Sequence, residues 1–195
     1  WDECLGGELH LLFECGLPSP LSYKRWLGEH LHQRQIVPYV LAAAKRRESD
    51  HVRRGLEGAT RSDALLLSEQ TGFAVLFEAK VLSDISIQVT YDSMRNQIAR
   101  SIDVMLELND GRPHPLSVRY PERNLFVLLT PQMYRDRPES RLYGRLMEEY
   151  RSEPSALARD LPHRRDVDWQ GVARRLGWLT WEECEDVLAG ACPWL

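Results

Sequence analysis

The chain of 195 residues has the length of one ordinary domain and can bury a core without disulfides or structural metals. Its composition, 43% hydrophobic and 28% charged, is that of a globular protein, and no apolar run approaches the ~18 residues of a membrane span, which excludes a membrane protein. The net charge of −4 excludes bulk attraction to nucleic acid, so any site for a polyanion must be local.

The number and spacing of the cysteines indicate the redox state of the cellular compartment. Cys4, Cys15, Cys184 and Cys192 show no Cys-x-x-Cys spacing, which excludes the usual metal and redox pairs. A chain of this size needs no disulfides, so the pattern favours a reducing compartment. The sequence also opens without the basic stretch and apolar segment of a secretory signal. We therefore expect a cytoplasmic protein.

The N-terminal part of the chain is predicted to be irregular and then helical. From Trp1 to Pro20, glycines and prolines surround a short apolar patch, which we interpret as irregular structure. From Leu21 to about Arg47, apolar residues recur at roughly helical spacing. Pro38 lacks an amide hydrogen, so it predicts either two helices or one bent helix.

Two apolar runs predict a hairpin at the centre of a sheet. Residues 64–67 and 73–77 are separated by a five-residue segment with the glycine typical of a hairpin loop. Both runs are apolar on successive residues, which indicates burial on both faces and hence a sheet between two layers of helices. Residues 124–130, ended by Pro131, predict another buried strand beside them. The predicted fold class is α/β.

The remaining pattern is helical. An apolar stripe predicts a helix over about residues 90–108, stopped by residues 109–111, and the three prolines of residues 112–123 predict a loop. Further helices are expected around residues 142–150, 167–176 and 180–188, the last opened by a capping box of Thr180 and Glu183. We expect a single domain over residues 1–195, with its core at about 21–131 and a helical extension at about 132–195.

The C-terminal region is rich in tryptophan. Four of the six tryptophans lie in the last 27 residues, namely Trp169, Trp178, Trp181 and Trp194. We interpret this region as a helical cap packed on the core, since aromatic side chains supply large buried area. The alternative is a docking face, for a protein partner, a second copy of the chain or unstacked bases.

Charged residues stand at the hairpin ends that the turn does not join. Asp63 precedes the first run, and Glu78-Ala79-Lys80 follows the second. Because strand side chains alternate between faces and antiparallel pairing sets these ends side by side, Asp63, Glu78 and Lys80 should converge at one sheet edge. Two carboxylates suit Mg²⁺, which prefers oxygen ligands and takes others from water and phosphate. The lysine can orient and help activate an attacking water.

This arrangement resembles the PD-(D/E)xK nuclease superfamily, whose signature is an acidic residue at a strand start and a following strand that ends in acid-x-Lys. Here the motif reads Ser62-Asp63 and then Glu78-Ala79-Lys80, with serine in place of the proline of the name. The resemblance covers roughly residues 21–131. It implies a restriction-endonuclease-like fold with a mixed central sheet flanked by helices, and phosphodiester hydrolysis dependent on Mg²⁺ or Mn²⁺.

The resemblance also implies roles for residues. Asp63 and Glu78 would bind the metal and Lys80 would assist the attacking water. Related nucleases often carry a glutamine on the helix that follows the lysine, and Gln97 lies where such a residue would fall. Gln97 is therefore the fourth candidate catalytic residue, although an exposed polar residue on a helix is an equally good reading.

Further candidates come from the flanking segments. Glu29 is the nearest acidic residue that a preceding helix could supply as a metal ligand, with Glu48 and Glu57 as weaker alternatives, and a solvated charge is the commoner reading of each. The planar guanidinium of arginine suits phosphate. Three arginines are therefore candidate contacts for nucleic acid, namely Arg61, Arg95 and Arg100.

We expect a metal-dependent nuclease that acts on nucleic acid, with DNA as the expected substrate. One alternative is a noncatalytic binding or scaffold domain of a larger assembly, which need not retain all of Asp63, Glu78 and Lys80. Another is a metal-dependent phosphohydrolase acting on nucleotides. Such an enzyme would more often carry a glycine-rich phosphate cradle such as Gly-x-x-x-x-Gly-Lys, which this sequence lacks.

Overall fold

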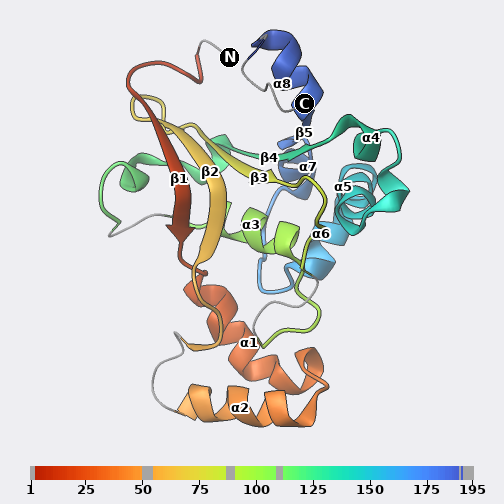
Figure 1. Ribbon diagram of the computed structural model, residues 1–195. Helices are drawn as coiled ribbons and strands as arrows, with labels where there is room; N and C mark the ends of the chain where they lie inside the picture. The colour runs from red at the N-terminus through yellow and green to blue at the C-terminus, as the bar shows by residue number, and fades with distance from the viewer. Residues whose placement is uncertain (1–2, 50–54, 87–90, 109–111, 189, 191–195) are drawn as a thin grey trace.

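A single sheet of five strands organises the molecule (Figure 1). The computed structural model describes residues 3–49, 55–86, 91–108, 112–188 and 190. Its strands, which keep their sequence order in the sheet, are β1 (Leu9–Leu17), β2 (Thr60–Ser68), β3 (Ala74–Ala79), β4 (Asn124–Thr130) and β5 (Leu176–Thr180). β2 is antiparallel to both β1 and β3, whereas β3, β4 and β5 are mutually parallel. The predicted α/β class, with a mixed sheet flanked by helices, is confirmed.

The predicted helices are present with differences in length, and α4 (Gln132–Arg135) and α6 (Ser155–Asp160) are additional to the prediction. The others are α1 (Leu21–Arg34), α2 (Pro38–Ser49), α3 (Gln97–Met105), α5 (Leu142–Ser152), α7 (Trp169–Ala173) and α8 (Trp181–Val187), with short 3₁₀ turns at Leu116–Val118, Pro121–Arg123 and Pro138–Ser140. The restart at Pro38 is confirmed, and Thr180 and Glu183 form the predicted capping box. No helix in the described ranges is both long and apolar enough to cross a membrane.

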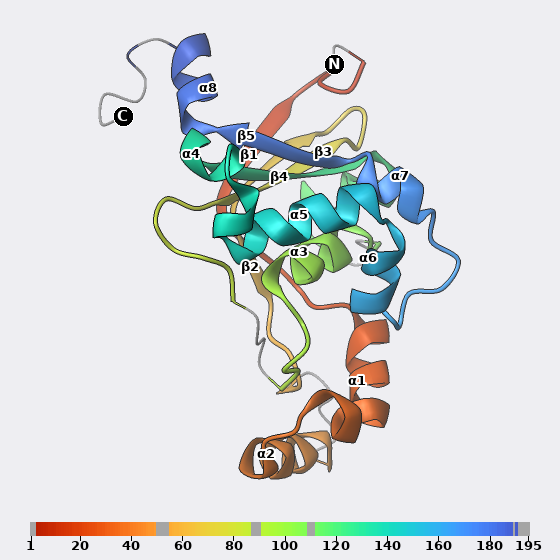
Figure 2. The same ribbon diagram turned by 90° about the vertical axis from the view of Figure 1, so that its right-hand side faces the viewer.

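The main core lies between the sheet and one layer of helices. Alternate strand residues, including Leu65, Leu76 and Leu128, pack with Ile98 and Ile102 of α3. Figure 2 shows α3, α5 and α6 on the same side of the sheet. α3 is shorter than expected and begins at residue 97, while its predicted stop at 109–111 lies outside the described residues. This layer positions α3 over the strand ends that carry the candidate site.

The opposite face of the sheet differs from the expected sandwich. Its buried cluster consists of Phe73, Val75 and Val127, with Cys4 and other partly buried side chains from strands and the N-terminal segment, and contains no residue of a described helix. The successive apolar residues of β2 and β3 therefore do face both sides of the sheet, but within the described ranges the buried cluster on the second face has no helical residue. Side chains of neighbouring strands and the N-terminal segment bury the second face.

α1 and α2 extend from the end of the sheet at which β2 begins (Figure 1). Tyr23, Leu27 and Leu31 of α1 form a second buried cluster with Ala44 of α2 and Leu56. Tyr23, Leu27 and Leu31 recur at helical spacing because this side of α1 faces a small core that it shares with α2.

Two strands are absent from the sequence-based prediction. β1 lies in the segment interpreted as irregular, and β5 lies between the two helices expected at about residues 167–176 and 180–188. Both strands depend on pairing with chain that is distant in sequence, β1 with β2 and β5 with β4. Gly177 of β5 shows the closeness of that pairing, because a Cβ placed there would lie 3.0 Å from a Val127 methyl group.

β5 also changes the interpretation of the tryptophan-rich region. Trp178 is buried on β5, and its indole Nε1 donates to Thr130 Oγ1 at 2.9 Å. Trp169 packs against the main core, in keeping with the cap interpretation. Trp194 lies outside the described residues.

Candidate active site

The candidate site lies where β2 and β3 separate. Their ladder ends at the pair Ala64–Phe77, after which β2 continues along β1 and β3 continues along β4. The backbone N–H of Ala79 lies beyond the β2–β3 ladder, and it donates to the side chain of Asp63, at Oδ2, at 2.6 Å. The Asp63 carboxylate therefore closes a notch between two diverging strands.

Alternation of side chains turns the charged residues toward the helical layer. Leu65 and Leu76 face that layer, so Asp63 and Glu78, each two residues along its own strand, share the same face. Lys80 follows Glu78 by two residues, and its Nζ donates to Glu78 Oε1 at 2.6 Å. The structure therefore places Asp63, Glu78 and Lys80 together at one end of the sheet.

Gln97 covers this group from above the sheet. It is the first residue of α3, whose N-cap is Asn96, and its Nε2 donates to Glu78 Oε1 at 2.6 Å. Its Oε1 accepts from the backbone N–H of Ser86 at 3.4 Å, which links the helix to the segment after Lys80. Both ends of the amide are used, so Gln97 holds Glu78 in position and is not simply an exposed helical residue.

Glu78 is the most buried member of the group, at 2% exposure. Burial raises the pKa of its carboxyl above the usual value, and the Asp63 charge adds to this effect, while the ammonium of Lys80 and the more distant Arg100 oppose it. The net direction is upward, so the charges around Glu78 do not fully compensate for its removal from water.

The oxygens of the site fit a hard divalent cation. Both hydrogen bonds to the Glu78 carboxylate go to Oε1. The other oxygen, Oε2, is buried and has no hydrogen-bond partner among the described residues. An unsatisfied buried carboxylate oxygen is costly, and a cation would satisfy it. With Asp63 beside it, the donor set consists of oxygen atoms from two carboxylates, as Mg²⁺ and Mn²⁺ prefer.

The other predicted metal ligands do not join this group. Glu29 is exposed on α1, and the charged groups with the largest effects on the pKa of Glu78 are Lys80, Asp63 and Arg100. Glu57 is buried but is occupied by ion pairs with arginine, as described below. The side chain of Glu48 lies outside the described part of the structure. The expectation of a third acidic ligand from Glu29 is therefore not supported by its position.

Arg95 is a structural residue, contrary to its expected role in binding nucleic acid. It is fully buried; its Nε donates to Glu57 Oε1 at 3.0 Å and its Nη2 to Asp103 Oδ2 at 2.8 Å. Its guanidinium carbon also lies 3.7 Å from the ring centre of Tyr23. A buried side chain held in this way has no surface on which to meet a phosphate.

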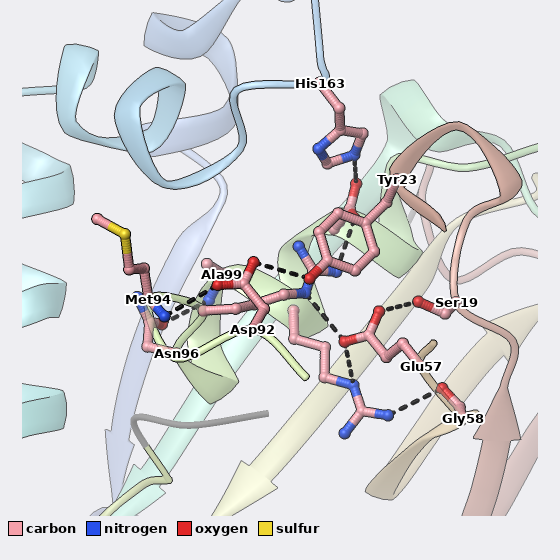
Figure 3. A network of polar contacts seen from close by, with 12 residues as sticks. Ser19, Tyr23, Glu57, Gly58, Asp92, Met94, Asn96, Ala99 and His163 are labelled. Carbon is pink, nitrogen blue, oxygen red and sulfur yellow. Dashed lines mark hydrogen bonds and ion pairs between the residues drawn. The ribbon is translucent and has the colours of Figure 1, made fainter. Parts of the chain in front are cut away.

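Figure 3 shows the buried polar network to which Arg95 belongs. Glu57 accepts a hydrogen bond from Ser19 and forms an ion pair with Arg100, while Tyr23 of α1 donates to Asp92 at 2.9 Å. Each of these contacts joins segments that are far apart in sequence. The network fixes α1 and the start of β2 against α3, directly beside the candidate site.

Asp103 and His163 continue this network toward the C-terminal region. Burial raises the pKa of Asp103, but the hydrogen bond from His163 and the positive charges of Arg95 and Arg164 outweigh it, and the net pKa lies far below the usual range. The ionised form of Asp103 is therefore held firmly in the fold.

The two other candidate arginines lie closer to the surface. Arg100 of α3 donates to the backbone carbonyls of Gly58 and Ala59, both at 2.9 Å, and pairs with Glu57. Arg61 is exposed on β2, two residues before Asp63. Arg61 therefore remains the candidate contact for nucleic acid whose position leaves it accessible.

The sequence pattern identifies the charged residues of the site but not their anchors. The sequence suggests Glu57 as an alternative metal ligand and Arg100 as a phosphate contact, whereas the two residues form an ion pair with each other. No local pattern predicts this pairing, since the residues are 43 positions apart and meet only when α3 packs on the sheet.

Comparison of the chain with protein-family models, with curated proteins and with solved structures finds no match.

Proposed function

We propose that this protein is a metal-dependent nuclease of the PD-(D/E)xK type with a restriction-endonuclease-like fold, and that Asp63 and Glu78 hold Mg²⁺ or Mn²⁺. The observation that carries the proposal is the group of polar side chains at the point where β2 and β3 separate. There Asp63, Glu78, Lys80 and Gln97 meet, and one carboxylate oxygen of Glu78 has no partner among the residues that the structure describes.

The energetics of Glu78 favour a functional over a structural role. Exposed ion pairs at strand ends are common and contribute little to stability. Glu78 is instead buried, its pKa is raised chiefly by burial, and its single ammonium partner leaves one oxygen unsatisfied. Such an arrangement opposes folding and is typical of a site selected for chemistry. A scaffold domain would have no reason to keep it.

Each side chain has a role in hydrolysis. A cation held here would neutralise the negative charge that develops on the phosphate during attack by water. Asp63 and Glu78 supply its carboxylate ligands. Lys80 can donate hydrogen bonds from its compact ammonium to the attacking water, and Gln97 is a positioning residue that fixes the orientation of Glu78.

The substrate class follows from local charge. A phosphodiester would approach the notch beside Arg61, which is exposed on the strand that carries Asp63. Since the net charge of the chain is −4, affinity must come from such local contacts and should fall steeply with salt. DNA is the substrate we propose, with RNA as the comparison in the test.

The test is single-turnover cleavage of labelled single-stranded and double-stranded DNA and RNA, with Mg²⁺, Mn²⁺ or EDTA. We expect cleavage only with metal, and a loss of at least about 100-fold in Asp63→Ala with the fold retained. Glu29→Gln is the matched control, because it removes an exposed carboxylate from α1 and should cut like the parent. Absence of metal-dependent cleavage on every substrate, or parental cleavage by Asp63→Ala, would contradict the proposal.

A further inference from the structure

A second group of ligand-type side chains lies at the other end of the sheet. His10 of β1, Glu69 of the turn between β2 and β3, and His114 of the loop between α3 and β4 meet there. His114 Nε2 lies 2.6 Å from Glu69 Oε1, and His10 Nε2 lies 3.3 Å from Glu69 Oε2. The imidazole rings stand edge to face, with centres 5.6 Å apart.

The main chain holds these three segments together independently of the side chains. His10 pairs with Leu67 in the β1–β2 ladder, and the Glu69 backbone N–H donates to the Glu8 carbonyl at 3.0 Å. The α3–β4 loop is attached to the same turn, because the Tyr120 N–H donates to the Gly72 carbonyl at 2.9 Å. The backbone therefore presents two imidazoles and a carboxylate to one point before any ligand binds.

The spacing suits a small tetrahedral ion. The ligand atoms all lie within 4.8 Å of one another. A tetrahedral zinc ion with bonds of ~2.0–2.1 Å sets its ligand atoms about 3.3 Å apart. The separation of His10 Nε2 from Glu69 Oε2 already has this value.

The chemistry of the donors distinguishes this group from the candidate active site. Imidazole nitrogen suits Zn²⁺ and neighbouring transition metals, whereas Mg²⁺ prefers oxygen. Asp63 and Glu69 are also separated by most of β2, about 17 Å or more at the usual rise per strand residue. The two groups therefore differ both in place and in the ion that they would select.

We propose that His10, Glu69 and His114 form a zinc-binding site with three protein ligands and a fourth position open to solvent. The side chains of Glu69 and His114 are 38% and 54% exposed, so an ion can reach the site. A bound ion would tie the edge strand β1 to the β2–β3 turn and to the α3–β4 loop. The proposal is independent of nuclease activity, because it rests on other residues at the far end of the sheet.

The test is titration of the metal-free protein with Zn²⁺ by calorimetry in excess Mg²⁺, together with the visible spectrum of the Co²⁺ form. We expect one Zn²⁺ per chain and the intense absorption of four-coordinate Co²⁺. His114→Ala and Glu69→Gln should each weaken Zn²⁺ binding by at least about 100-fold, more than the ~10–100-fold typical of residues that only support a ligand. Binding should also weaken on acidification, because the imidazoles must lose protons.

Three controls make the result decisive. His32→Ala removes an exposed histidine of α1 and should bind Zn²⁺ like the parent. Asp63→Ala should also leave Zn²⁺ binding unchanged, and circular dichroism should show that metal-free His114→Ala is folded. The proposal is overturned if the parent binds no Zn²⁺, if folded His114→Ala binds it as tightly as the parent, or if Asp63→Ala abolishes binding.

Discussion

Glu78→Gln separates the effect of the Glu78 charge on the stability of the protein from its effect on cleavage. The substitution keeps the size and shape of the side chain, and the amide oxygen can still accept from Gln97. It removes the negative charge that a cation needs and that the fold bears at 2% exposure. We therefore expect cleavage to fall by at least about 100-fold, while the metal-free protein is at least as stable as the parent.

The sign and size of the stability effect follow from the raised pKa of Glu78. A glutamate whose pKa is higher in the folded state contributes stability that is full below the pKa of the unfolded chain and is lost as the pH rises through the folded-state pKa. The substituted protein has no such loss. Relative to the parent, its free energy of unfolding should increase by about 1.4 kcal/mol for each pH unit between those two pKa values, and stay constant above them.

Loss of the pair with Lys80 reduces this gain only in part. Lys80 is itself partly exposed, and the pKa of Glu78 is raised even with that ammonium in place. Saturating Mg²⁺ should reverse the order of stability, because it stabilises the parent by about 2.7 kcal/mol at 100 times its dissociation constant and the variant by less.

The assay is urea denaturation of parent and Glu78→Gln between pH 4 and pH 8, in EDTA and in Mg²⁺, alongside single-turnover cleavage. A variant that is less stable than the parent in EDTA at neutral pH would show that the surroundings stabilise the charge of Glu78. A variant that cuts at the parental rate would show that the charge has no catalytic role. Either result would refute the reasoning.

Three further substitutions test the neighbouring residues. Lys80→Arg keeps the charge, but its bulky planar guanidinium cannot replace a compact ammonium. Single-turnover cleavage should therefore fall, while DNA binding in Ca²⁺, measured at several salt concentrations, persists. Cleavage at the parental rate would show that Lys80 is only a nearby charge. Gln97→Ala frees Glu78 to move, so the concentration of Mg²⁺ needed for half-maximal cleavage should rise about 10- to 100-fold, and an unchanged requirement would exclude positioning by Gln97. Arg95→Met removes a buried partner of Glu57 and Asp103 and should lower the free energy of unfolding by about 3–5 kcal/mol in urea; weaker DNA binding at unchanged stability would instead make Arg95 a nucleic-acid contact.

The parts of the fold that have local sequence signals were predictable. Successive apolar residues predicted β2, β3 and β4, the helix restart was readable from Pro38, and a capping box marked the start of α8 at Thr180. The charged cluster was also predictable, because a hairpin has one register and side-chain alternation assigns Asp63 and Glu78 to one face. These features depend on neighbours within a few residues or across one turn.

Features that depend on pairing between distant segments were not predictable from local sequence. β1 and β5 become strands because β2 and β4 offer them hydrogen-bonding partners, which short segments of weak pattern do not reveal alone. The sequence predicts Arg95 to be a surface cation, whereas packing buries it between two carboxylates. His10 and His114 lie more than 100 residues apart, and they meet at Glu69 because the β1–β2 ladder and the α3–β4 loop end at the same turn. Contacts of this kind follow from the packed chain, since each residue's local sequence is compatible with either environment.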